Sequence, residues 1–191
     1  MEKAVKKSEG VKKKASKENP MRQIQIEKVT INIGTGPDEE KVKKALLLLS
    51  KFSKNKPVKC LAKKRIAAFK IRPGLPIGAK LTVRNSEAKQ LILNLLKARD
   101  NVLPEKVFDE NGFSFGITEY IDIPGIKYDP KVGMLGMDVC VTLTRPGYRI
   151  KKRKLKSRIS KKHKILKEDS ISFAEKELGV QIKWREQELK K

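Results

Sequence analysis

The sequence lacks any long apolar run: the longest, Ala45 to Leu49, has five residues, whereas a transmembrane helix needs about 20. It has only two cysteines, Cys60 and Cys140, and one histidine, so a zinc site has no ligand set. We expect both cysteines to be small buried hydrophobic residues of a cytoplasmic chain. The N-terminal residues include no apolar segment of the kind that a secretory signal needs. The sequence therefore predicts no membrane span, no metal and no other cofactor.

Negative charge is scarce as well, because 22 acidic residues stand against 46 Lys and Arg, which gives a formal net charge of +24. Polyanionic nucleic acid is the usual partner of such a charge. An anionic membrane is the alternative partner, but it usually requires a basic amphipathic helix with interfacial aromatic residues. The single Trp184 belongs to no such helix. The composition therefore favours nucleic acid and disfavours a membrane surface.

The basic residues are also segregated along the chain. Residues 1–20 contain seven lysines and few large aliphatic residues, which predicts a flexible basic tail. From Lys41 to Ser86 there are 14 basic residues and no acidic one, and residues 145–167 contain twelve more without an acid. A surface that is merely solvated mixes its signs. We expect three segments: the tail at 1–20, an α+β domain at 21–150, and a basic segment with a C-terminal helix at 151–191.

Alternating apolar residues predict antiparallel strands with one buried and one exposed face. Such strands are expected at 22–33, 80–84, 113–123 and 136–144, and residues 57–60 are expected to start a short extended piece. The alternation slips at Glu27-Lys28, which predicts a bulge there. Apolar stripes predict helices from Pro37 to about Ser53 and from Ser86, as the N-cap, to Arg99. A last helix should run from about Asp169 to Leu178 and end at Gly179.

These elements predict an α+β fold, an antiparallel sheet with amphipathic helices on one face. The other face is open and carries small polar residues, which leaves it free to meet a ligand. They are Asn32, Thr30, Thr82 and Thr142. Residues 65–78 contain two prolines, two glycines and three basic residues, which is typical of a long functional loop. From Lys151 the chain continues as a basic C-terminal extension.

The sequence offers little for catalysis. Gly34-Thr35-Gly36 lies between a strand and a helix like a dinucleotide-binding turn, but Glu39 replaces the third glycine of that motif. The acidic residues 38–40 would occupy the helix N-terminus themselves and repel a phosphate, so we expect a tight turn in which Thr35 caps the helix. His163 lies in the sequence KKHK without a nearby carboxylate, which favours a phosphate or base contact over general base chemistry. No enzyme is predicted.

Aromatic residues make up only 5% of the chain, too few for a surface that stacks single-stranded bases. Gly112 to Gly116 is only distantly similar to an RNA-binding strand of the RRM type, and Phe113 and Phe115 share the phase of the core. The expected ligand is therefore structured RNA, contacted by cations at phosphates and by small polar side chains at riboses and base edges.

Four segments resemble, in order and spacing, the ribosomal protein L-five family of the large subunit. They are VTINIG at 29–34, AKKRIAAFKIRPGLPIGAKLTVR at 62–84, FDENGFSFGITEYIDIPGIKYDP at 108–130 and GMDVCVTLTRPG at 136–147. The C-terminal residues 158–184 are similar to the archaeal and eukaryotic form of the family, and Asn19-Pro20-Met21-Arg22 to the archaeal form.

The resemblance implies a structural protein of the central protuberance. Its partners would be 5S rRNA, 23S rRNA, the P-site tRNA and neighbouring ribosomal proteins, and its location the cytoplasmic ribosome. The residues expected at 5S rRNA are Asn32, Asn55, Thr82, Lys63, Lys64 and Arg84. Those expected in a tRNA-contacting loop are Arg65, Lys70, Ile71, Arg72, Pro73 and Gly74. Further rRNA phosphate contacts are expected from Arg149, Lys151, Lys152, Arg153, Lys154, Arg158, Lys161, Lys162 and His163.

Two other hypotheses remain open at this stage. A chromatin-type protein that compacts nucleic acid through charge alone would bind any polyanion with similar affinity. A nucleotide-using enzyme built on Gly34–Gly36 would bind nucleotides despite the acidic residues that follow.

Overall fold

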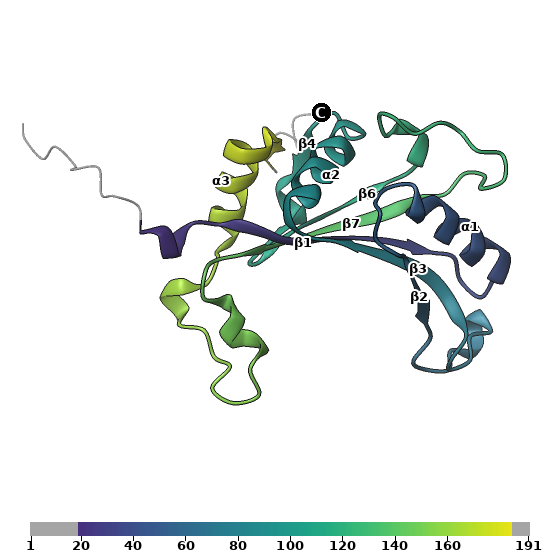
Figure 1. The fold of residues 1–191 in the computed structure, drawn as a ribbon, viewed down its shortest axis with the longest axis horizontal. Coiled ribbons are helices and arrows are strands. Elements are labelled where there is room, and N and C mark those ends of the chain that lie inside the picture. The colour runs from purple at the N-terminus through teal and green to yellow at the C-terminus, as the bar shows by residue number, and fades with distance from the viewer. Residues whose placement is uncertain (1–18, 185–191) are drawn as a thin grey trace, which may run out of the picture.

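The molecule is built around a six-stranded antiparallel sheet with one face covered by helices and one face open (Figure 1). The computed structural model describes residues 19–184, so the predicted tail at 1–20 lies almost wholly outside the described residues. Six strands pair in the order β2-β3-β1-β7-β6-β5, and the helices cover one face, which confirms the predicted α+β class. Within the described part of the chain, none of the helices is both long and apolar enough to cross a membrane.

The elements follow the periodicity of the sequence closely. The strands are β1 (Gln25–Gly34), β2 (Val58–Leu61), β3 (Pro76–Val83), β4 (Val102–Pro104), β5 (Phe108–Asp109), β6 (Gly112–Ile117), β7 (Met137–Thr144) and β8 (Gln181–Lys183). The α-helices are α1 (Glu39–Ser50), α2 (Asn85–Lys97) and α3 (Lys167–Leu178). Short 3-10 helices are η1 (Pro20–Arg22), η2 (Ala67–Phe69), η3 (Glu105–Val107), η4 (Tyr120–Asp122), η5 (Tyr148–Lys152) and η6 (Lys161–His163).

The core lies between the helices and the covered face of the sheet. Alternate residues of β1 (Val29, Ile31 and Ile33) are at most 1% exposed, and they pack in one cluster with the apolar stripe of α2. That stripe, Ala88, Leu91, Ile92, Leu95 and Leu96, is buried as the sequence predicts. Burial of an aliphatic side chain contributes about 1.5–3 kcal/mol each, so this cluster dominates the stability of the fold.

The bulge in β1 is confirmed, because the register against β7 shifts between Ile26 and Lys28. Both predicted helix N-caps are wrong. Asp38 caps α1 by accepting the Glu40 N–H at 3.2 Å, since the chain turns at Gly36 (φ +68°) before the helix begins. Arg84 is the N-cap of α2, because the helix already starts at Asn85.

Two predicted strands differ most from the observed bounds. β6 ends at Ile117, and η4 follows it, so Ile121 is exposed although Ile123 is buried. β3 begins at Pro76, inside the predicted loop. A proline is tolerated there because it is the first residue of the strand and faces the irregular end of β2 at Leu61.

The C-terminal residues are joined to the same core. The predicted last helix is confirmed as α3, which ends at Gly179 in a left-handed conformation (φ +65°). β8 then pairs in parallel with β4, a two-stranded sheet that the sequence did not reveal. Ile165, Ala174 and Leu178 belong to the main hydrophobic cluster.

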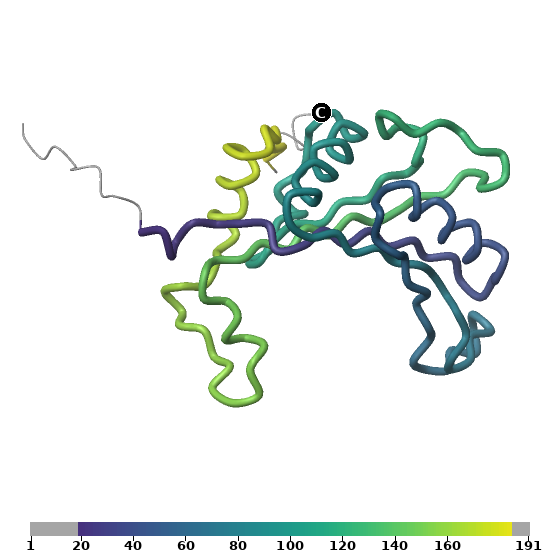
Figure 2. Tube along the Cα trace, viewed as in Figure 1, coloured from purple at the N-terminus to yellow at the C-terminus, as the bar shows by residue number. Residues whose placement is uncertain are grey.

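Two segments leave the sheet on the side opposite the helices (Figure 1). We call residues 62–75, between β2 and β3, the first arm, and residues 146–164, between β7 and α3, the second arm. Figure 2 shows that each arm is an excursion whose two ends return to the body of the molecule. The open face of the sheet lies between them.

Candidate nucleic-acid interface

The open face carries short polar side chains in register across four strands. One row runs from β3 to β6 through Thr82, Thr30, Cys140 and Ser114. The next row contains Lys80, Asn32, Asp138 and Gly116. No strand residue in these rows is bulky and apolar, so a nucleic acid backbone can come close to the sheet.

The structure brings three of the predicted 5S rRNA residues together on this face. Asn32 and Thr82 lie on neighbouring strands, one row apart. Asn55 joins them from the chain before β2, where its side-chain amide donates to the Thr82 carbonyl at 3.3 Å. Between described residues, no hydrogen bond involves the Asn32 amide or the Thr82 hydroxyl, so both groups remain available to a ligand.

Cys140 lies exposed in the middle of the open face, and Cys60 on β2 is half-buried, so the prediction of two buried cysteines is wrong. The alternation of β7 explains Cys140, because its odd-numbered residues enter the core and its even-numbered ones do not. Partial desolvation and the neighbouring Asp138 carboxylate raise the pKa of the Cys140 thiol. The thiol is therefore a poor nucleophile at neutral pH.

The first arm is a small folded hairpin. The Ala62 amide donates to the Leu75 carbonyl at 2.8 Å, and Ile66 and Ile71 exchange two backbone hydrogen bonds at 3.0 and 3.1 Å. Lys70 turns the chain in the left-handed conformation (φ +55°). The charged residues Lys63, Lys64, Arg65, Lys70 and Arg72 are exposed on this arm.

The first arm contains residues from both predicted RNA sites. Lys63 and Lys64, which were predicted at 5S rRNA, lie on this arm and not on the open face. Ile71 is only 9% exposed, so its side chain supports the arm and is not displayed to a ligand. By contrast Phe69, which was not among the predicted site residues, is 66% exposed at the turn of the arm. Phe69 could have been identified from the sequence, because it is a large apolar residue in a loop of basic residues.

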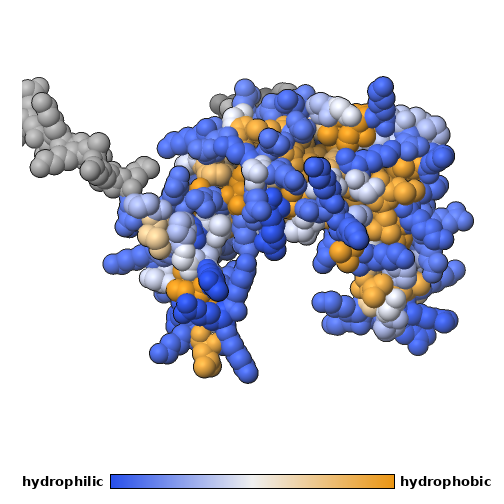
Figure 3. Space-filling view, viewed as in Figure 1, coloured by the Kyte–Doolittle hydropathy of each residue, from blue (hydrophilic) through white to orange (hydrophobic). Residues whose placement is uncertain are grey.

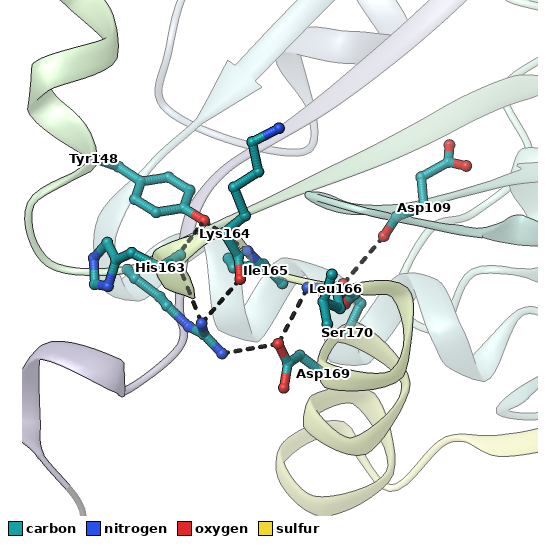
Figure 4. Close-up of polar contacts among 9 residues, drawn as sticks. Asp109, Tyr148, His163, Lys164, Ile165, Leu166, Asp169 and Ser170 are labelled. Carbon is teal, nitrogen blue, oxygen red and sulfur yellow. Dashed lines mark hydrogen bonds and ion pairs between the residues drawn. The ribbon is translucent and has the colours of Figure 1, made fainter. Parts of the chain in front are cut away.

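The ends of the second arm are held together by a clasp of hydrogen bonds, drawn in Figure 4. Arg145 donates to the Lys164 carbonyl at 3.0 Å and pairs with the Asp169 carboxylate at 2.9 Å. The Tyr148 hydroxyl donates to the His163 carbonyl at 3.1 Å and accepts the Ile165 amide at 2.8 Å. Burial, the largest cause, raises the pKa of Tyr148, so the phenol stays protonated and keeps both bonds.

His163 belongs to this clasp. One ring nitrogen, Nε2, lies 2.8 Å from the Pro146 carbonyl, and the ring packs edge-on against Tyr148 at 5.7 Å between centroids. The expected phosphate or base contact is therefore not supported for His163, because its ring is half-buried and already bonded to the chain. The sequence did not reveal the clasp, since its partners are 15 to 24 residues apart.

The other cations predicted on the second arm project outward. Arg149, Lys151, Lys152, Arg153, Lys154, Arg158, Lys161 and Lys162 are all exposed. Figure 3 shows hydrophilic side chains over much of both arms and a hollow in the molecule between them. The arms and the open face thus form one concave surface with two basic sides.

Most acidic residues lie elsewhere. Asp38 and Glu40 are at the start of α1, and Glu168, Glu175 and Glu177 are on α3, within the helical layer. Asp138, on the open face, and Glu27 are exceptions. The Glu27 Oε1 lies 2.8 Å from Lys152 Nζ and 3.8 Å from Arg84 Nη1. Hydrogen bonding to Lys152, the largest cause, lowers the pKa of the Glu27 carboxyl.

The arrangement offers donors for phosphates and riboses rather than groups for catalysis. Gly34 ends β1, the Thr35 amide donates to the Ile77 carbonyl of β3 at 3.1 Å, and the chain turns at Gly36-Pro37. Across residues 19–184, no group of three His, Cys, Asp or Glu side chains could hold a metal ion.

Comparisons with known proteins agree with this geometry. The profile of the family described as Ribosomal protein L5 matches residues 19–72, and the profile of the C-terminus of the same ribosomal family matches residues 76–173. The chain is 50% identical over 167 residues to large ribosomal subunit protein uL5 of Nanoarchaeum equitans, covering 86% of this chain and 99% of that protein. It is 46% identical over 171 residues to the protein of the same name from Archaeoglobus fulgidus, covering 89% and 96%.

The two profiles together cover the open face, the second arm and residues 62–72 of the first arm, and the relatives are archaeal, as the ends of the chain indicated. The family is one of structural proteins and not of enzymes, and its place is the ribosome in the cytoplasm. The chain therefore belongs to the ribosomal protein L5 family.

Proposed function

We propose that this protein is a structural component of the large ribosomal subunit that binds 5S rRNA through the open face of its sheet. In this role it links 5S rRNA to 23S rRNA in the central protuberance and contacts the P-site tRNA through the loop at 65–78. The single observation that carries the proposal is the concave surface itself, a helix-free sheet face of short polar side chains between two basic arms.

Each part of this surface suits a different part of an RNA. Asn32 and Thr82 offer an amide and a hydroxyl without partners among the described residues, and both can bond riboses or base edges of a folded RNA. The exposed cations of the second arm, together with Arg84, would contact phosphates, which supply most of the affinity and fix the register of the complex.

The first arm suits a separate partner. It is folded by its own backbone hydrogen bonds and projects away from the sheet, so it can reach another RNA while the open face is occupied. In the proposed complex, Arg65, Lys70, Arg72, Pro73 and Gly74 face the P-site tRNA, and Ile71 holds the arm in shape.

Competition binding of the full chain tests the proposal. The affinities for 5S rRNA, for duplex DNA of equal length and for an unrelated structured RNA are compared across a salt series. We expect 5S rRNA to keep its advantage above about 0.2 M salt, because contacts other than phosphates are salt-insensitive. If the three curves fall together, the protein binds by charge alone, as the chromatin-type hypothesis predicts, and the proposal is wrong.

A further inference from the structure

The bulge in β1 breaks the alternation at Glu27, next to Lys28, which belongs to the open face. Arg84 follows Lys80 and Thr82 in the same phase at the end of β3, and Lys152 belongs to the second arm. The Glu27 carboxylate therefore lies where the open face meets the second arm.

One oxygen of Glu27 serves both cations. Its Oε1 accepts a hydrogen bond from Lys152 at 2.8 Å and lies 3.8 Å from Arg84 Nη1. The Glu27 side chain is 24% exposed, whereas those of Arg84 and Lys152 are 53% and 68% exposed. Both cations can thus be reached by a phosphate, but each already faces an internal anion.

An internal anion among cations affects two kinds of RNA differently. A nucleic acid held only by its phosphates has to compete with the carboxylate for Arg84 and Lys152, and it loses affinity. An RNA that also forms hydrogen bonds with the open face is positioned by those bonds. It then meets a Lys152 side chain that the Glu27 carboxylate of β1 already holds in place.

We propose that Glu27 is a specificity-determining residue, which lowers the affinity for non-cognate nucleic acid more than the affinity for the RNA that fits the open face. This inference rests on the proposed function, because it takes 5S rRNA as the RNA that fits. The bulge in β1, which places Glu27 beside Lys152, would thus contribute to RNA selection.

The experiment compares Glu27→Gln with the wild-type full chain. Releasing one cation to an additional phosphate contact should raise the affinity for an unrelated duplex RNA by about five- to eightfold at 0.1 M salt. The affinity for 5S rRNA should change by less than about twofold, so the preference for 5S rRNA should fall several-fold. Thermal unfolding and circular dichroism confirm that the variant is folded.

Glu177→Gln is the matched control, because Glu177 also bonds a lysine, Lys89, at 2.7 Å, but within the helical layer. It removes the same charge and should leave the preference unchanged. The double variant Glu27→Gln/Lys152→Gln should lose the gain for duplex RNA, since Lys152, at 2.8 Å, is hydrogen-bonded to the Glu27 carboxylate, whereas Arg84 lies 3.8 Å away.

Three results would overturn the inference. In Glu27→Gln the affinities for duplex RNA and for 5S rRNA could rise by the same factor. Glu177→Gln could lose as much of the preference for 5S rRNA as Glu27→Gln, or the double variant could keep the raised affinity for duplex RNA. A wild-type protein without any preference for 5S rRNA would instead refute the proposed function.

Discussion

Short side chains at the centre of the open face define the proposed RNA site at the scale of single residues. Asn32 and Thr82 are half-buried, and their side-chain polar groups bond no other described residue. Their replacement should therefore change RNA binding without changing the structure, which separates a binding role from a structural one.

Asn32→Ala and Thr82→Ala are each expected to weaken 5S rRNA binding by about 1–3 kcal/mol, because a buried polar group of the RNA would lose its partner. The measurement is equilibrium binding at two salt concentrations, and the loss should be the same at both, since no charge is removed. Ser86→Ala, on the exposed surface of α2, is the control. Unchanged affinity in both variants would contradict the site assignment.

Glu27 also makes a pH-dependent contribution to stability. Its pKa is lowered in the folded chain, first by the Lys152 hydrogen bond and also by the charges of Lys152, Lys28 and Arg84. The folded state therefore binds this proton less readily than the unfolded state, so the stabilisation is present above the ordinary pKa of 4.5 and is lost as the pH falls through the lowered value.

We expect the free energy of unfolding of the wild type to exceed that of Glu27→Gln by less than about 1 kcal/mol at pH 7, because both cationic partners are mostly exposed. The difference should shrink as the pH is lowered from about 5 to about 3. Urea titrations of both proteins at each pH measure it. A difference that grew on acidification would show that the carboxylate is not stabilised by these cations.

At the scale of elements, the two arms are built in different ways. The first arm closes on itself through backbone hydrogen bonds, whereas the second is held at its ends by the side chains of Arg145 and Tyr148. Changes at the tip of the first arm should therefore affect its ligand, and changes in the clasp should affect the position of the second arm.

Phe69→Ala and the pair Lys70→Gln/Arg72→Gln are expected to leave 5S rRNA binding within about twofold of wild type, because these residues lie away from the open face. In assembled ribosomes they should weaken P-site tRNA binding, and filter binding of tRNA to reconstituted subunits measures this. Equal losses for 5S rRNA would show instead that the first arm belongs to the 5S site.

Arg145→Met should destabilise the protein by about 1–3 kcal/mol, because the Lys164 carbonyl loses its side-chain donor and the half-exposed Asp169 carboxylate loses its ion pair. Hydrogen exchange of the Ile165 amide, which is bonded to Tyr148, should accelerate more than exchange in β1. Lys89→Met, which removes an exposed pair with Glu177, is the control. Uniform acceleration throughout the chain would contradict a local clasp.

At the scale of the whole molecule, the C-terminal segment contributes to the core beneath the helices. Ile165, Ile171 and Leu178 are buried at the far side of the second arm, and the Ser170 hydroxyl bonds the Asp109 carbonyl at 3.2 Å. The predicted segment boundary at 150 therefore separates parts that share one hydrophobic cluster.

A chain truncated after residue 150 is expected to lose about 5 kcal/mol or more, since three large aliphatic side chains leave the core at about 1.5–3 kcal/mol each. Such a loss approaches the total stability of a domain of this size. Thermal unfolding followed by circular dichroism tests it, with a chain truncated after 184 as the control. Cooperative unfolding of the shorter chain near the wild-type temperature would show that residues 21–150 fold alone.

The sequence predicted most of the fold and part of the candidate site. Alternation in β1 and β7 and the stripe of α2 gave the covered face correctly, and the phase of β1 and β3 placed Asn32 and Thr82 on the open one. The N-caps of α1 and α2 and the end of β6 were wrong, because the residue that begins or ends an element depends on turn geometry at single positions such as Gly36 and Tyr120.

What the sequence determined by itself is the set of features that depend on local periodicity and composition: the class of fold, the identity of the faces and the positive charge. Only the tertiary structure decided which distant residues meet. Glu27 and Lys152 are 125 residues apart, and Arg145 and Asp169 are 24 apart. Such contacts depend on how the sheet twists and where each arm leaves it, and no local pattern specifies those because the free energy of the entire packed core decides them.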